Sequence, residues 1–194
     1  MDERAHLELS ELLIHGRQHV GPKHLAQPAP NEAELRELFA AAAAAPDHGQ
    51  LRPWRFLVLG EQARDRLAQC FAEALLERDP QAQPEQLDDA RRKAARGPLL
   101  LLAVADLRAD DPDVAETERL VSLGCAIQNL LLAARARGYA SGLSSGRALR
   151  SQPLREAFGI RAGEEAVCFI TLGTPTRLKP RRQRPAVEDF VQWI

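Results

Sequence analysis

The sequence has no excess of charge of one sign and no long hydrophobic run. Its 26 lysines and arginines are balanced by 27 aspartates and glutamates, so the formal net charge is -1. The overall charge does not steer the chain to a nucleic acid or an anionic membrane surface, although basic residues cluster locally near the end. The longest apolar run, Leu120 to Ala134, is interrupted by polar residues and is shorter than the roughly 20 residues that cross a bilayer. Residues 1–13 lack the positively charged start and apolar core of a signal peptide. We therefore expect a cytoplasmic protein that binds neither nucleic acid nor membrane.

Cysteine is also scarce. The three residues, Cys70, Cys125 and Cys168, are widely spaced and lie in apolar surroundings. Their odd number and their spacing fit neither a disulfide framework nor a set of metal ligands. We expect all three to be buried thiols in a reducing cytoplasm.

The common nucleotide-binding motifs are missing. No G-x-x-x-x-G-K-[ST] loop is present, and no G-x-G-x-x-G stands at a strand-to-helix turn.

Gly142 to Gly146 fits the G-x-S-x-G pattern of serine hydrolases, but that fold needs a histidine downstream and all five histidines lie at or before His48. A glycine-rich turn is therefore favoured over a serine nucleophile.

The spacing of His15, His19 and His24 would suit a metal site only on a helix. Gly16, Gly21 and Pro22 interrupt this stretch, so a solvated or anion-binding loop is favoured over zinc.

The length of 194 residues suits a single core, so one domain is expected over residues 1–194, and hydrophobic periodicity predicts its elements. Helices are expected at 3–15, 31–45, 62–78, 85–95, 115–137 and 149–158, and strands at 54–59, 99–105, 138–146 and 166–172. Asn31 should cap the second helix, with Glu34 completing a capping box. The unbroken apolar run 99–105 is typical of a central strand covered on both faces. Helix 115–137, apolar nearly all round, is expected in the core and at a subunit interface.

The stretch from Ala41 to Leu59 combines a helix end, a polar loop and a strand start. Pro46 cannot continue a helix, so the helix should stop near Ala45. His48 follows in the loop, where on its own a hydrogen bond to a backbone carbonyl is its expected role. Two bulky aromatic residues, Phe190 and Trp193, lie near the end of the chain with no later element to cover them. We expect them to pack against a partner subunit.

Several segments together resemble the nitroreductase family, in particular its small YdjA-like branch. The matching segments are Leu9 to Arg17, Ala26 to Pro30, Ala45-Pro-Asp-His48, Pro53-Trp54 with Phe56, Arg96-Gly-Pro-Leu99, Leu123 to Ala126, Ser145-Gly146, Leu154 to Gly159 and Leu172-Gly-Thr-Pro175. The likeness covers nearly the whole chain, and A-P-D-H followed by P-W-x-F, with L-G-T-P near the end, is specific in combination.

The resemblance implies an α+β fold, with a mostly antiparallel central sheet wrapped by helices, in an intertwined homodimer whose tails cross the partner. Flavin mononucleotide (FMN) would lie at the dimer interface. NAD(P)H would reduce it, and a nitroaromatic, quinone or similar electrophile would then be reduced in a ping-pong reaction. The cofactor supplies the chemistry in such enzymes, so no protein residue is expected to be catalytic and no metal is expected.

The resemblance also implies a set of FMN-binding residues. These are Arg17, Gln18, His48, Leu143, Ser144 and Ser145. Arg52, Arg182 and Arg184, with Lys23 and His24, are further candidates for cations that replace the family arginines missing from this chain. His48 would reach the flavin of the partner chain. The arginines of the tail suit a phosphate because a guanidinium group donates two parallel hydrogen bonds.

The chain departs from the family at the phosphate-binding motif. Of the family's two arginines and serine, only Arg17 is kept, between Gly16 and Gln18, and Ala44 stands where a further arginine is frequent. This favours a second hypothesis, a flavin-free member that serves as a small-molecule binding or regulatory module.

Overall fold

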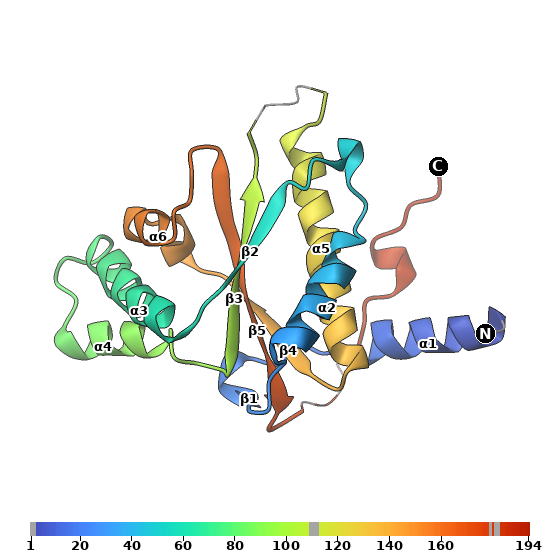
Figure 1. The fold of residues 1–194 in the computed structure, drawn as a ribbon, viewed down its shortest axis with the longest axis horizontal. Coiled ribbons are helices and arrows are strands. Elements are labelled where there is room, and N and C mark those ends of the chain that lie inside the picture. Colours follow the sequence, from blue (N-terminus) through green and yellow to red (C-terminus); the bar gives the residue numbers. More distant parts are fainter. Residues whose placement is uncertain (1–2, 109–112, 179, 181–182) are drawn as a thin grey trace.

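The computed structural model describes residues 3–108, 113–178, 180 and 183–194. Its centre is a five-stranded sheet in which β1, β5, β3 and β2 follow one another and β4 also pairs with β5 (Figure 1). The strands are β1 (Leu25–Ala26), β2 (Trp54–Val58), β3 (Leu99–Asp106), β4 (Ala140–Ser144) and β5 (Glu164–Pro175). Every pair of these strands is antiparallel. The predicted α+β fold with a mostly antiparallel sheet is therefore confirmed.

Strand β3 holds the middle of the sheet because it pairs with β2 on one side and β5 on the other. Its alternate side chains belong to two separate cores: Leu101 packs in one and Leu102 in the other. Both are fully buried, so the prediction of a central strand covered on both faces is confirmed.

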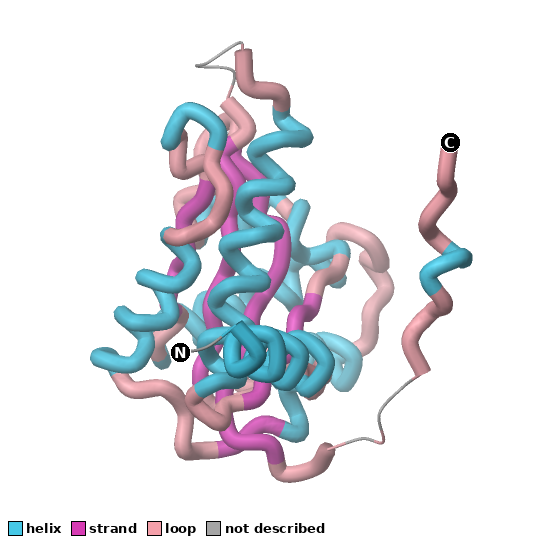
Figure 2. Tube along the Cα trace, turned by 90° about the vertical axis from the view of Figure 1, so that its right-hand side faces the viewer, coloured by secondary structure: helices cyan, strands magenta, loops and turns pink. Residues whose placement is uncertain are grey.

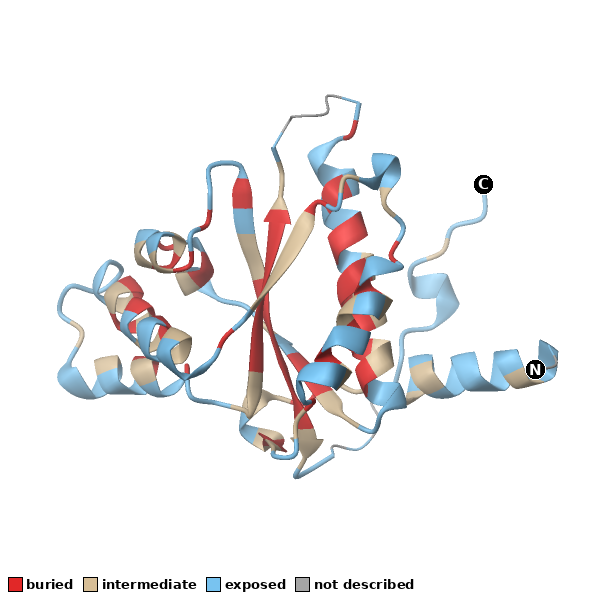
Figure 3. Ribbon diagram, in the orientation of Figure 1, coloured by how far each residue is buried: buried red, intermediate tan, exposed pale blue. Residues whose placement is uncertain are grey.

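Helices cover the two faces of the sheet (Figures 1 and 3). One face packs against α2 (Glu32–Ala43) and α5 (Glu116–Ala136), and the other packs against α3 (Glu61–Leu76) and α6 (Gln152–Ala157), with α4 (Pro84–Arg92) beside α3. Four short 3-10 turns complete the described part of the chain: η1 (Pro22–His24), η2 (His48–Gln50), η3 (Arg147–Arg150) and η4 (Val187–Asp189).

Local signals placed most helix ends well. Asn31 caps α2 and forms the predicted capping box with Glu34. Gly159, whose φ of 56° is left-handed, follows the end of α6 as expected. The predicted start of that helix at residue 149 is wrong, because residues 147–150 form the separate turn η3 and α6 begins at Gln152. Pro153 lies in the first turn of α6, where its missing N–H costs nothing.

Two segments at the chain ends lie away from this body. Helix α1 (Glu3–Gly16) has no buried residue, and the described tail 183–194 runs apart from the sheet (Figures 1 and 2). Their apolar side chains are largely exposed, among them Leu12 at 60% and Trp193 at 92%. A single 14-residue helix is marginal in water without packing, and α1 buries none of its described residues. None of the described helices is long and apolar enough to span a membrane.

Candidate functional site

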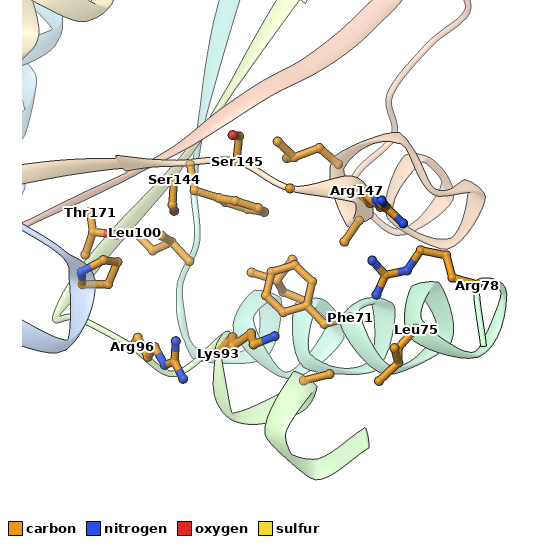
Figure 4. Close-up of a pocket in the computed structure, with 17 residues that line it drawn as sticks. Phe71, Leu75, Arg78, Lys93, Arg96, Leu100, Ser144, Ser145, Arg147 and Thr171 are labelled. Atoms are coloured by element: carbon orange, nitrogen blue, oxygen red, sulfur yellow. The ribbon is translucent and has the colours of Figure 1, made fainter. Parts of the chain in front are cut away.

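A cavity of about 390 Å³ opens between the end of β4 and helices α3 and α4 (Figure 4). Residues from five places in the chain line it: Pro22, Leu67, Phe71, Leu75, Arg78, Ala90, Lys93, Arg96, Leu100, Ser144, Ser145, Gly146, Arg147, Ala148, Leu149, Phe169 and Thr171. This volume is within the usual range for small-molecule sites.

The turn from Ser144 to Arg147 forms one wall. Strand β4 pairs with β5 as far as Ser144, after which the chain leaves the sheet and enters η3. Leu149, on η3, is buried against the core and so anchors the turn. A Cβ built on Gly146 would meet no other atom within 4 Å. The space beside Gly146 is therefore open, and the turn from Ser144 to Arg147 borders the cavity.

The wall formed by the sheet and α3 is apolar apart from one hydroxyl. Phe71 and Leu75 from α3 face Leu100 from β3 across the cavity. Thr171, on β5, lines it too, and its Oγ1 is buried without a hydrogen-bond partner among the described residues. An unmade hydrogen bond of a buried hydroxyl costs about 1–3 kcal/mol. A ligand with a polar atom at this wall would remove that cost.

Positive charge is the third property of the cavity. Arg78, Lys93, Arg96 and Arg147 line it, and none of its described lining residues is acidic. Since the whole chain has a formal net charge of only -1, this concentration of cations is local. The cavity therefore suits a ligand with a flat apolar body and an anionic group.

Arg64 holds the connection from α4 to β3 that carries two of these cations. Its guanidinium group donates to the carbonyl oxygens of Ala94 at 3.3 Å, Gly97 at 2.9 Å and Pro98 at 3.2 Å. Burial lowers the pKa of Arg64 from its usual value. These bonds fix the backbone beside Lys93 and Arg96.

The structure separates the residues that the resemblance assigns to FMN. Ser144 and Ser145 line the 390 Å³ cavity and also a cavity of about 380 Å³ on the α5 side, where Leu143 joins them. Arg17 and Gln18 line a third cavity, of about 180 Å³, together with Arg135. Arg184 reaches the same region, because its Nη2 donates to the carbonyl oxygen of Arg17 at 3.5 Å. Arg182 lies outside the described residues.

His48 and Arg52 lie between α2 and β2 and line none of these three cavities. His48 forms a side-chain hydrogen bond, in which Nδ1 lies 2.9 Å from Glu118 Oε2. That hydrogen bond lowers the pKa of Glu118. Arg52 has a left-handed φ of 49°, and its N–H donates to Asp47 Oδ2 at 2.7 Å.

The expectation that all three cysteines are buried is correct for Cys70 and Cys168, but Cys125 is only half-buried. Burial raises the pKa of Cys168 to about 11. Cys125 lies on α5, next to Gly124, which lines the cavity on that side of the sheet.

Sequence reasoning missed the cations of the main cavity. Lys93 and Arg147 lie in charged segments that look like solvated surface, and Arg96 entered only as part of a family segment. Thr171 did carry a signal, since it is the one hydroxyl in the apolar run 166–172. A polar residue within a fully buried strand needs a partner.

Comparison with known proteins agrees with this fold. A model described as the nitroreductase family matches residues 23–174. A protein of Haemophilus influenzae named "Putative NAD(P)H nitroreductase" is 35% identical over 176 residues, which cover 89% of this chain and 93% of that protein.

Two solved structures share the architecture at low sequence identity. The nitroreductase-like family protein from Bacillus cereus has a TM-score of 0.79 at 19% identity, covering 96% of this chain and 95% of that one. The FMN-dependent nitroreductase NfnB from Mycobacterium smegmatis, solved in complex with NADPH, has a TM-score of 0.71 at 18% identity, covering 97% and 99%.

The matched region runs from Lys23, just before β1, to Thr174 near the end of β5. It therefore includes all of the sheet except Pro175, both helical layers and every residue that lines the main cavity except Pro22. The chain belongs to the nitroreductase family of oxidoreductases.

Proposed function

We propose that this protein is an FMN-dependent oxidoreductase that transfers hydride from NAD(P)H to a nitroaromatic, a quinone or a similar electrophile in a ping-pong reaction. The observation that carries the proposal is the 390 Å³ cavity, which combines an apolar wall with four cations and has no acidic residue among its described lining. The names of the Haemophilus influenzae relative and of the Mycobacterium smegmatis structure support the same cofactors.

The residues of the cavity fit FMN. The ring system of FMN is flat and largely apolar, as is the wall that contains Phe71 and Leu100. The ring also carries polar edges that need hydrogen bonds, which we propose come from the Ser144–Gly146 turn and, after rotation of its buried hydroxyl toward the cavity, from Thr171. Lys93 and Arg96 would hold its negative charge.

The roles expected for the other residues remain predictions. Arg17 and Gln18 line the separate 180 Å³ cavity, with Arg184 close by, and we propose them as a second phosphate contact. Leu143, on the α5 side of β4, would border the cofactor from there. The loop with His48 and Arg52 would contact the cofactor of the other subunit.

Bound FMN would supply the redox chemistry by accepting a hydride and passing it on. The chain's own contribution is to bind, orient and exclude water. The apolar side chains Phe71, Leu75 and Leu149 exclude water from one side of the cavity. Glu118, through its 2.9 Å contact with Nδ1, orients His48 and leaves Nε2 directed away from that carboxylate.

We further propose a homodimer with the cofactor site at its interface. The exposed apolar residues of α1 and of the tail, such as Leu12 and Phe190, support it. The exposed pair Leu120 and Val121 on α5 offers them a matching surface. The reducing cytoplasm suits the three free thiols and the supply of NAD(P)H.

A titration with FMN, followed by quenching of flavin fluorescence, tests the proposal. We expect saturable binding, a yellow protein and bleaching of the flavin absorbance on addition of NADPH or NADH. The variant Lys93→Gln/Arg96→Gln should bind FMN at least tenfold more weakly, since each charge-assisted hydrogen bond contributes about 1.5–3 kcal/mol. Arg36→Gln, an exposed change on α2, is the control. A wild-type protein that stays colourless at high FMN concentration would instead favour the flavin-free binding module.

A further inference from the structure

We propose that Arg78 and Arg147 form a second anion-binding point of the main cavity, which recognises a negatively charged group on the substrate that meets the flavin. The inference rests on the proposed function and adds the class of substrate. The anionic group is either the 2′-phosphate of NADPH or a carboxylate on the electron acceptor.

Arg78 and Arg147 come from elements that are far apart in sequence. Arg78 directly follows the last turn of α3, and its Nε donates to the carbonyl oxygen of Ala74 at 3.0 Å. Arg147 is the first residue of η3. Figure 4 shows both guanidinium groups at one end of the cavity, with Arg96 toward the other end. The Arg78 backbone contact therefore fixes its stem and leaves the terminal nitrogens to a ligand.

The same two arginines also line a groove of about 820 Å³ that continues from the cavity. Its other lining residues include Glu77 and Glu165, yet neither Arg78 nor Arg147 forms an ion pair with a carboxylate among the described residues. The like charges of the two arginines repel each other, weakly because both side chains are exposed to water. A bound anion would turn that repulsion into attraction.

A count of charges indicates that Arg78 and Arg147 are not needed to bind the cofactor. FMN has one phosphate group with at most two negative charges, which Lys93 and Arg96, together with the proposed second contact at Arg17, can balance. The two arginines at the other end of the cavity are then left without an anion. Arginine is suited to carboxylate and phosphate groups because it offers paired donors in one plane.

The surface between the two arginines indicates the rest of the ligand. Phe71, Leu75 and Leu149 line the same cavity, and Figure 4 shows Phe71 and Leu75 on the helix that leads to Arg78. A ligand that reaches both arginines therefore has an apolar or aromatic body against these side chains. An aromatic acceptor with a carboxylate has this shape, as does a nicotinamide dinucleotide with an extra phosphate.

The experiment compares charged and neutral substrates on the flavin-loaded enzyme. Arg78→Gln, Arg147→Gln and the double variant are assayed for kcat/KM with NADPH against NADH, and with 4-nitrobenzoate against 4-nitrobenzyl alcohol. Arg66→Gln, an exposed change on α3 outside the cavity, is the matched control. We expect the double variant to lose at least tenfold in kcat/KM for the anionic member of one pair, with less than twofold change for its neutral counterpart. The pair that responds identifies the source of the anionic group.

The FMN dissociation constant of the same preparations distinguishes the two proposals. It should stay within about twofold of the wild-type value in the double variant. Arg78→Lys/Arg147→Lys, which keeps the charge, should recover part of the discrimination. Equal losses for the charged and neutral substrates, or a tenfold weaker FMN affinity in the double variant, would overturn the second anion-binding point alone. A wild-type chain that binds no FMN would overturn the proposed function.

Discussion

Glu164 illustrates how one buried charge can tie three segments of the chain together. Its carboxylate, at the start of β5, accepts hydrogen bonds from Arg55 on β2 at 2.8 and 3.0 Å and from Arg161 at 2.6 to 3.0 Å. Burial acts to raise the pKa of Glu164, but these hydrogen bonds outweigh it and lower the pKa to about 2. The ionised carboxylate of Glu164 therefore stabilises the folded state at every pH at which it keeps its charge.

Glu164→Gln should lower the free energy of unfolding by about 3 kcal/mol at pH 7, the equivalent of a shift from 4.5 to about 2. Because the folded pKa is depressed, this contribution is complete above about pH 4.5 and is lost as the pH falls toward 2. Urea unfolding at pH 7 and pH 3 measures it, with exposed Glu165→Gln as control. A difference between wild type and variant that does not shrink at pH 3 would contradict this account.

At the scale of the element, patterns within a few residues were enough to predict most helix ends. Asn31 and Glu34 are three residues apart, so the capping box they form is legible in the sequence. The cavity could not be predicted in this way. Lys93 and Ser144 are far apart in the sequence, and both line the cavity only because of the order of the strands in the sheet. Local periodicity holds no information on that order. The family resemblance predicted the antiparallel sheet, but none of the arginines that it assigned to FMN lines the main cavity, whose arginines are Arg78, Arg96 and Arg147.

Removal of the α2 cap should have a modest and specific cost. Asn31→Ala deletes the side chain that accepts a hydrogen bond from Glu34 N at 3.0 Å, and we expect a loss of about 1 kcal/mol in the free energy of unfolding. Asn31→Asp keeps an acceptor and should stay within a few tenths of a kcal/mol of wild type. Thermal and urea denaturation measure both variants. Equal stabilities of the alanine and aspartate variants would show that the cap contributes nothing.

At the scale of the whole molecule, the two ends of the described chain expose much of its large apolar side-chain surface. Phe190 is 69% exposed, Trp193 is 92% exposed, and α1 has no buried residue. Exposed apolar patches of this kind usually mark an interface. Since these side chains touch little of their own chain, substitutions there should act on association and leave the fold of the body intact.

The variant Phe190→Ser/Trp193→Ser should shift the protein from dimer to monomer at micromolar concentration, because it removes two large apolar side chains from the proposed interface. Light scattering coupled to gel filtration reports the mass, and circular dichroism reports whether the fold is kept. Leu76→Ser, an exposed change at the end of α3, is the control. A variant that remains as dimeric as wild type would exclude the tail from the interface.

The projecting tail and α1 also affect which fraction of the protein holds cofactor at a given protein concentration. If a second chain completes each cofactor site, FMN binding and dimerisation are linked equilibria, and each promotes the other by mass action. Dilution then releases cofactor even when free FMN is held constant. The apparent FMN affinity becomes a property of protein concentration, so a cell that makes little of this chain would hold mostly empty, monomeric copies, and flavin supply would govern its assembly.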